Sequence, residues 1–262
     1  MRQRLKGIGI IAPIVIGFFL NRVISAIIAL ALGAVIYYEL HQALLKKDIN
    51  IPYSFGIATM IALGAISFKI PNCHYVVIIS AIAGIVSLFL QENIKIKNIF
   101  LTIFCALYAF IPYWMMSLLH YGFNTHLGDV VTSLIFTIAF ATDISAMLVG
   151  HHFGKHKLSK VSPNKTIEGS IGGVIGALIA YCIWALVWQT GLSAVEFVPL
   201  VVVGSVSAQA GDLFASYIKR KCGIKDYSNL LPGHGGFLDR FDSVSFASFT
   251  LWVGIILCLF LA

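Results

Sequence analysis

Charged side chains gather near the C-terminus of this 262-residue chain, in the segment KDYSNLLPGHGGFLDRFDS at residues 225–243. Asp239 and Asp242 are three residues apart, a spacing that places both carboxylates on one face of a helix. Asp212 lies upstream in an apolar run, where an ionised carboxylate is costly unless it has a partner or a function. Hard oxygen ligands favour Mg²⁺ over zinc. We therefore predict that these aspartates bind Mg²⁺, with a second, monovalent cation left open.

Basic residues are interleaved with these carboxylates. A polybasic patch facing anionic lipid would explain the cations alone, but not their mixing with acidic groups. Carboxylates, Mg²⁺ and basic side chains on phosphate oxygens are the usual groups for phosphoryl or nucleotidyl transfer, where the protein positions groups and offsets charge. The cations concerned are Lys165, Lys219, Arg220, Lys225 and Arg240.

The sequence leaves the roles of two further residues near these charges open. In the turn His234-Gly235-Gly236, the glycines allow backbone N–H groups to approach an anion closely. His234 itself is open between an acid/base, a phosphate donor and a structural residue. Asp143, in the apolar run IFTIAFATDISAMLVG, carries the same burial cost as Asp212, and its role is open between function and structure.

The elements that must position these groups are apolar. The chain is 59% hydrophobic and 11% charged, and its mean hydropathy of +0.91 lies outside the range of soluble globular proteins. Long runs without period-2 alternation predict membrane helices rather than strands. We expect an all-α, polytopic membrane bundle with helices at Ile8–Leu20, Val23–Tyr38, Ile51–Ile70, Cys73–Leu90, Ile99–Leu119, Val130–Gly150, Gly169–Gln189, Phe197–Ala215 and Val244–Ala262.

The placement of lysine and arginine predicts the orientation of these helices. With nine spans and the N-terminus inside, sixteen of the eighteen basic residues fall in inside segments, as the positive-inside rule requires. The net charge of +7 then reflects topology and phosphate binding, so we expect no nucleic-acid partner. Residues 151–168 and 216–243 are the long inside segments. They should form the catalytic region of a single membrane domain, residues 1–262, on the cytoplasmic side.

The glycine-rich segment EGSIGGVIG is similar in composition to a phosphate-binding loop. However, Gly169, Gly172, Gly173 and Gly176 fall at helical spacing within a long apolar run. Overlapping GxxxG patterns in such a run are typical of helices that pack closely in a membrane. We therefore predict a packing surface here, and not a nucleotide-binding loop.

The C-terminal residues also follow a longer pattern: Ser-x-x-Lys-Arg, four residues, Lys-Asp, then Pro-x-His-Gly-Gly and Asp-Arg-x-Asp, running from Ser216 to Asp242. In this pattern the chain resembles the bacterial phosphatidate cytidylyltransferases, also called CDP-diacylglycerol synthases. The supporting matches are Gly211-Asp212, Asp143, Ser162-Pro163, Lys165-Thr166 and Glu168-Gly169. The chain departs from the family at Asn164, where lysine is common, and at Met147, where tyrosine is common.

The resemblance implies that CMP passes from CTP to phosphatidic acid, giving CDP-diacylglycerol and pyrophosphate. A compact chain without an organelle-targeting leader suggests a prokaryotic inner membrane. Its partners would be these substrates and membrane lipids, and a homodimer is left open. The resemblance implies Mg²⁺ ligands at Asp212, Asp239, Asp242 and Asp143, and a catalytic role for Lys225. Substrate contacts would come from Lys165, Thr166, Ser216, Lys219, Arg220, His234, Gly235, Gly236 and Arg240.

Two other functions remain as alternatives. A CTP-dependent lipid or polyprenol kinase would use a similar bundle and nucleotide, but would release CDP in place of pyrophosphate. An ion-coupled transporter would place its function at Asp143 and Asp212 within the membrane, and would tolerate changes at Asp239 and Asp242.

Overall fold

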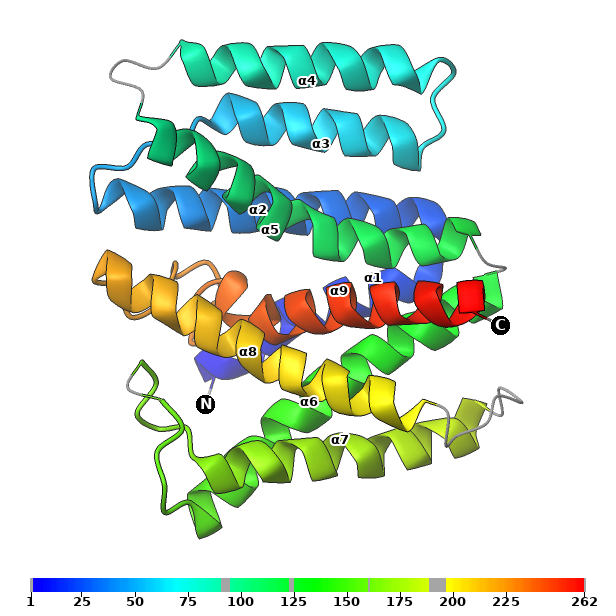
Figure 1. Ribbon diagram of the computed structural model, residues 1–262, viewed down its shortest axis with the longest axis vertical. Helices are drawn as coiled ribbons and strands as arrows, with labels where there is room; N and C mark the ends of the chain where they lie inside the picture. Colours follow the sequence, from blue (N-terminus) through cyan, green and yellow to red (C-terminus); the bar gives the residue numbers. More distant parts are fainter. Residues whose placement is uncertain (1, 91–94, 123–124, 160, 189–196, 262) are drawn as a thin grey trace. The chain divides into compact units, whose positions relative to one another are not determined.

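The computed structural model describes residues 2–90, 95–122, 125–159, 161–188 and 197–261, and most of these residues are helical (Figure 1). Each of the nine helices in these ranges overlaps one of the apolar runs found in the sequence, although the third and fourth helices are shorter than their predicted runs. The helices are α1 (Arg2–Leu20), α2 (Arg22–Leu45), α3 (Tyr53–Ser67), α4 (Cys73–Phe89), α5 (Ile96–Gly122), α6 (Thr125–Phe153), α7 (Ile167–Trp188), α8 (Val198–Cys222) and α9 (Leu238–Leu261). The all-helical prediction is confirmed.

Six of these helices are long and apolar enough to cross a membrane: α2, α5, α6, α7, α8 and α9. The apolar parts of α1, α3 and α4 are shorter, at 10–17 residues. A spanning helix needs roughly 20 apolar residues, fewer where the bilayer thins or the helix ends extend into the headgroups. The chain is therefore an integral membrane protein with many helices.

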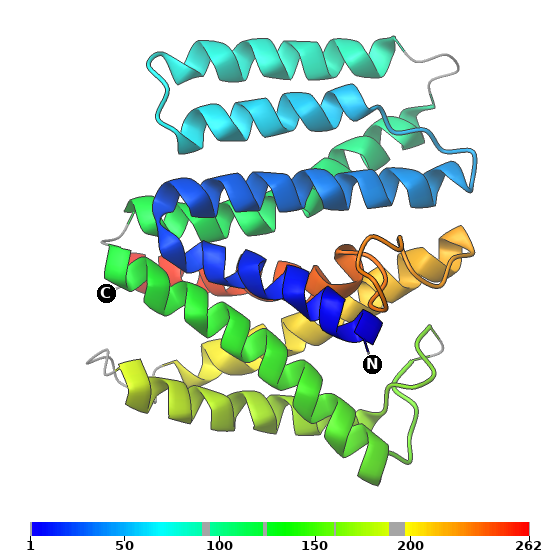
Figure 2. The same ribbon diagram turned by 180° about the vertical axis from the view of Figure 1, so that it is seen from behind.

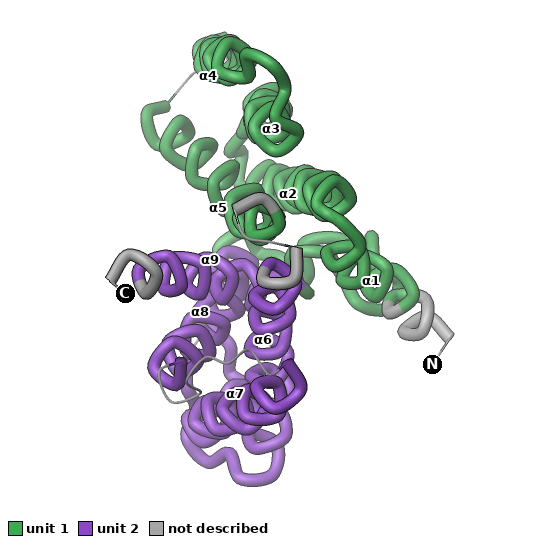
Figure 3. The backbone as a smooth tube through the Cα atoms, turned by 90° about the vertical axis from the view of Figure 1, so that its right-hand side faces the viewer, with its two compact units in different colours: residues 1–125, 221–240 green, residues 126–220, 241–262 purple. Residues whose placement is uncertain are grey.

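The chain packs as two compact units (Figure 3). Unit 1 comprises residues 1–125 and 221–240, and unit 2 comprises residues 126–220 and 241–262. The segment 216–243, predicted to carry much of the chemistry, is divided between them. Its middle part belongs to unit 1, whereas both of its ends belong to unit 2.

In unit 1, α2 packs against α1, α3 and α5, and α3 packs against α4 (Figures 1 and 2). The chain breaks between α1 and α2 at Asn21, as the sequence predicts. The Asn21 side chain accepts hydrogen bonds from the backbone N–H groups of Val23 (3.0 Å) and Ile24 (2.9 Å). It thereby satisfies donors that a helix start leaves without partners.

In unit 2, glycines allow α7 to lie very close to α6. A Cβ atom added at Gly172 would lie 2.5 Å from the Cβ of Val149, and one added at Gly176 would collide with Ser145. The prediction of close helix packing in EGSIGGVIG is confirmed. In the same unit, α8 and α9 are joined by a 2.6 Å hydrogen bond between the hydroxyls of Ser207 and Thr250.

The loops that the sequence predicts at residues 151–168 and 216–243 are shorter in the structure. Helix α6 continues to Phe153, α8 continues to Cys222, and α9 begins at Leu238. These helices are longer than their apolar runs because backbone hydrogen bonding continues into the polar residues that flank each run. Residue 160, in the first loop, lies outside the described residues.

We expect Gly172→Ala to destabilise the protein, because its methyl group would overlap Val149. Overpacking of this kind costs about 1–3 kcal/mol, so the thermal unfolding midpoint in detergent should fall. Ile175→Ala is the matched control, since Ile175 lies on the exposed face of the same helix. Equal midpoints for the two variants would contradict the close contact between α6 and α7.

Candidate functional site

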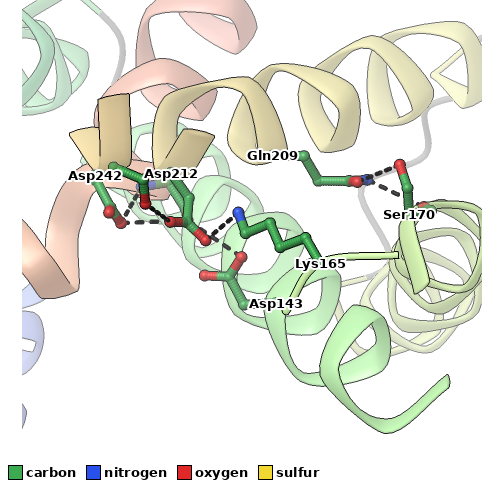
Figure 4. A network of polar contacts seen from close by, with 8 residues as sticks. Asp143, Lys165, Ser170, Gln209, Asp212 and Asp242 are labelled. Carbon is green, nitrogen blue, oxygen red and sulfur yellow. Dashed lines mark hydrogen bonds and ion pairs between the residues drawn. The ribbon is translucent and has the colours of Figure 1, made fainter. Parts of the chain in front are cut away.

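Three carboxylates from three helices face one another in unit 2: Asp143 on α6, Asp212 on α8 and Asp242 on α9 (Figure 4). The Ser243 hydroxyl lies 3.2 Å from Asp143 Oδ1 and 3.5 Å from Asp242 Oδ1, and so links two of them. Asp242 is buried, Asp212 is half-buried and Asp143 is exposed. We call these three residues the carboxylate cluster.

Lys165 reaches the cluster from the loop before α7 (Figure 4). Its ammonium group forms an ion pair with Asp212 Oδ2 and also attracts Asp143. Lys219, two turns beyond Asp212 on α8, attracts Asp242. If all three carboxylates are ionised, two ammonium groups leave the cluster with excess negative charge. A further cation would therefore be bound favourably.

The loop that carries Lys165 is a short hairpin. Its two sides are tied by the Leu158 N–H donating to the Lys165 carbonyl (2.8 Å) and by an isolated antiparallel bridge between Lys157 and Thr166. The Thr166 hydroxyl accepts a hydrogen bond from the N–H of Gly169 (3.0 Å) at the start of α7. Thr166, predicted to contact substrate, thus caps α7 in the structure.

Polar residues around the cluster fix its helices. Ser216, one turn after Asp212, donates to Asp212 Oδ1 (3.4 Å). Gln209, one turn before Asp212, donates to the Ser170 carbonyl (3.2 Å) and accepts from the Ser170 hydroxyl (2.5 Å), joining α8 to α7. Neither Gln209 nor Ser170 was predicted from the sequence. The signal that could have found Gln209 is a polar residue three positions from a charged one in an apolar helix.

The other half of the predicted site lies in unit 1, in the loop between α8 and α9. Asp239 Oδ2 accepts hydrogen bonds from the backbone N–H groups of Tyr227 and Gly236, both at 2.9 Å. The N–H groups of Phe237 and Leu238 donate to Glu39 of α2, both at 2.8 Å. The N–H groups of this loop do approach anions closely, but here the anions are the protein's own carboxylates.

The loop also sets the positions of His234 and Arg240. Arg240 Nε donates to the His234 carbonyl (2.9 Å), and His234 Nδ1 lies 3.4 Å from the Pro232 carbonyl oxygen. The imidazole packs against α1 so tightly that a Cβ atom at Gly7 would lie 3.0 Å from its Cε1. Lys225 on this loop is exposed, and so is the Arg240 side chain.

The structure therefore sorts the predicted residues into two groups. The first, in unit 2, consists of the carboxylate cluster with Lys165, Ser216 and Lys219. The second, in unit 1, consists of Lys225, His234, Gly235, Gly236, Asp239 and Arg240. Arg220 is exposed at the end of α8. Within the described ranges, no three His, Cys, Asp or Glu side chains form a group that could hold a metal ion. The predicted metal-binding roles of Asp143, Asp212, Asp239 and Asp242 stay predictions.

The chain is similar to known proteins that are named for the same enzymatic activity. The chain matches the cytidylyltransferase family over residues 2–258. It is 31% identical over 259 residues to a phosphatidate cytidylyltransferase of Bacillus subtilis (strain 168), covering 94% of each chain. Phosphatidate cytidylyltransferases of Synechocystis sp. and Haemophilus influenzae are similar over shorter stretches. The first is 40% identical over 138 residues (52% of this chain, 46% of the relative), the second 38% over 162 residues (58% and 56%).

A double-mutant cycle tests the contact between Lys165 and Asp212. Because each residue loses its partner when the other is removed, Lys165→Ala and Asp212→Ala should be less than additive in free energy of unfolding, with a coupling of about 1 kcal/mol. Lys155→Ala, which removes an exposed side chain from the same loop, should be additive with Asp212→Ala. Equal coupling in the two cycles would show that Lys165 does not pair with Asp212.

Proposed function

Because this chain belongs to the cytidylyltransferase family, we propose that it transfers CMP from CTP to phosphatidic acid. A phosphate oxygen of the lipid attacks the α-phosphorus of CTP and forms a new P–O bond. The bond from the α-phosphorus to the bridging oxygen breaks, and pyrophosphate leaves with that electron pair. The product, CDP-diacylglycerol, stays in the membrane. The observation that carries this proposal is the carboxylate cluster with Lys165 in a chain that matches the family over nearly its whole length.

The donors of the carboxylate cluster fit a divalent cation in kind and charge. They are all oxygen atoms, and their charge exceeds that of the two neighbouring lysines. Mg²⁺ commonly takes one or two carboxylates and completes its shell with water and substrate phosphates, so an open protein ligand set is suitable. Asp143, Asp212 and Asp242 would hold the ion, which when bound neutralises charge on the triphosphate.

The chain's own cations supply the rest of the charge balance. Lys165 is held at the cluster by Asp212, so its ammonium group lies where a bound phosphate oxygen would need it. Lys219 lies near Asp242 and can act on the same phosphates. Transfer of this type depends on positioning and charge compensation, so no covalent nucleophile is needed. Lys225 and Arg240, on the unit 1 loop, are proposed to bind phosphate as well.

The proposed orientation puts the loops 154–166 and 223–237 on the cytoplasmic side of a prokaryotic inner membrane. Sixteen of eighteen basic residues then lie inside, including those of both loops. CTP would reach the site from the cytosol. Phosphatidic acid would enter from the inner leaflet with its acyl chains still in lipid.

The reaction is tested with purified protein, labelled CTP, phosphatidic acid and Mg²⁺. Lipid-linked CMP should form with one pyrophosphate per turnover, and a chelator should abolish it. Asp143→Asn and Asp242→Asn should each lower kcat/KM roughly 100-fold or more, since each removes charge that the site needs. Asp48→Asn is the control, because Asp48 is an exposed carboxylate in the turn after α2.

Release of CDP with a phosphorylated lipid would show the alternative kinase reaction. Normal turnover by folded Asp143→Asn and Asp242→Asn variants would show that the carboxylate cluster is not the catalytic site. Thermal unfolding midpoints distinguish a folded, inactive variant from one that has lost its structure.

A further inference from the structure

Glu39 on α2 is a buried carboxylate with no part in the chemistry described above. Its side chain is 0% exposed, yet it accepts three hydrogen bonds from the loop before α9. Oε1 accepts from the Ser228 hydroxyl (2.5 Å) and from the N–H of Phe237 (2.8 Å). Oε2 accepts from the N–H of Leu238 (2.8 Å). All four residues belong to unit 1.

Through these contacts Glu39 occupies the N-terminus of α9, which begins at Leu238. The first N–H groups of a helix have no acceptor within the helix, and the helix dipole favours a negative charge beside them. Glu39 therefore caps the N-terminus of α9, although it lies 199 residues away from Leu238 in the sequence. Since the protein's own carboxylate fills this end of the helix, it is closed to a substrate phosphate.

The same contact explains one glycine of the His234-Gly235-Gly236 turn. A Cβ atom added at Gly236 would lie 2.6 Å from Glu39 Oε1 and 2.9 Å from its Cδ, so a side chain there would displace the carboxylate. Gly235 is required for a different reason, because its φ of +85° disfavours other residues. Gly236 thus makes room for Glu39.

The position of Arg240 depends on this arrangement. Its Nε donates to the carbonyl of His234, which lies in the loop that Glu39 and Asp239 hold by its N–H groups. We propose that Glu39 is a positioning residue that fixes the loop 228–238 and, through it, the Arg240 guanidinium for binding the triphosphate of CTP. The inference rests on the proposed function for the identity of the nucleotide.

The kinetic test uses Glu39→Gln, which keeps the size of the side chain but replaces one acceptor oxygen with an NH₂ donor. The apparent KM for CTP should rise roughly tenfold with little change in kcat, the scale expected for a lost hydrogen bond to a charged group. Gly236→Ala should reproduce the effect. Gln42→Ala is the control on the same helix, since Gln42 bonds only the exposed hydroxyl of Tyr53 (2.8 Å) among the contacts described. A lower kcat per folded protein at unchanged KM would mean that Glu39 is merely structural, and would overturn the proposal.

Hydrogen exchange examines the contact independently of the reaction. In the wild-type protein the amides of Phe237 and Leu238 should exchange slowly, and in Glu39→Gln they should exchange faster. Rapid exchange of both amides in the wild type would overturn the role of Glu39, even if Glu39→Gln fails to accumulate. If instead exchange behaves as expected but the wild type forms no lipid-linked CMP, the failure lies in the proposed reaction.

Discussion

A carboxylate among apolar helices needs compensation, and the acids of this protein obtain it in two different ways. Glu39 and Asp239 are compensated by backbone N–H groups of a single loop. Asp143, Asp212 and Asp242 instead face one another, with Lys165 and Lys219 nearby. Only the second set keeps charge that a substrate-borne cation can balance. We place the chemistry there for that reason.

The two sets are held in place by different contacts. The loop before α9 is fixed by internal hydrogen bonds, so its exposed cations extend from a defined backbone. The carboxylate cluster is held by contacts between helices, such as Ser243 with Asp143 and Gln209 with Ser170. Both sets depend on α9, whose first turn carries Asp239 and whose second carries Asp242. In the proposed reaction CTP carries a triphosphate and the lipid carries a phosphate, so several positioned charges would be needed.

Much of the fold follows from the sequence because hydropathy and glycine spacing act locally. All nine helices were expected from their apolar runs, and the contact of α7 with α6 was expected from Gly172 and Gly176. The ends of α2, α5, α6 and α8 were placed too early, since polar residues at a helix end still form backbone hydrogen bonds, whereas those of α3 and α4 were placed slightly too late. The clustering of Asp212 with Asp242 was expected. For Asp143, the residues alone left the role open, and only the family resemblance placed it with the other aspartates.

Glu39 could not have been found in the same way. It is a single acidic residue in the run YYELHQ, and its partners Phe237 and Leu238 are nearly 200 residues away. Nothing local distinguishes it from an interfacial charge. Likewise, the spacing of Asp239 and Asp242 predicts a shared helix face, but not that Asp239 accepts two N–H groups of its own loop.

Binding of Mn²⁺ to the purified protein, followed by electron paramagnetic resonance, addresses the carboxylate cluster without requiring turnover. The wild-type chain and Asp48→Asn should bind the ion with equal affinity. Asp143→Asn and Asp242→Asn should bind it at least tenfold more weakly, since each removes an anionic oxygen donor. Undiminished binding in both folded variants would show that the ion is held elsewhere, and that these three aspartates are not its site.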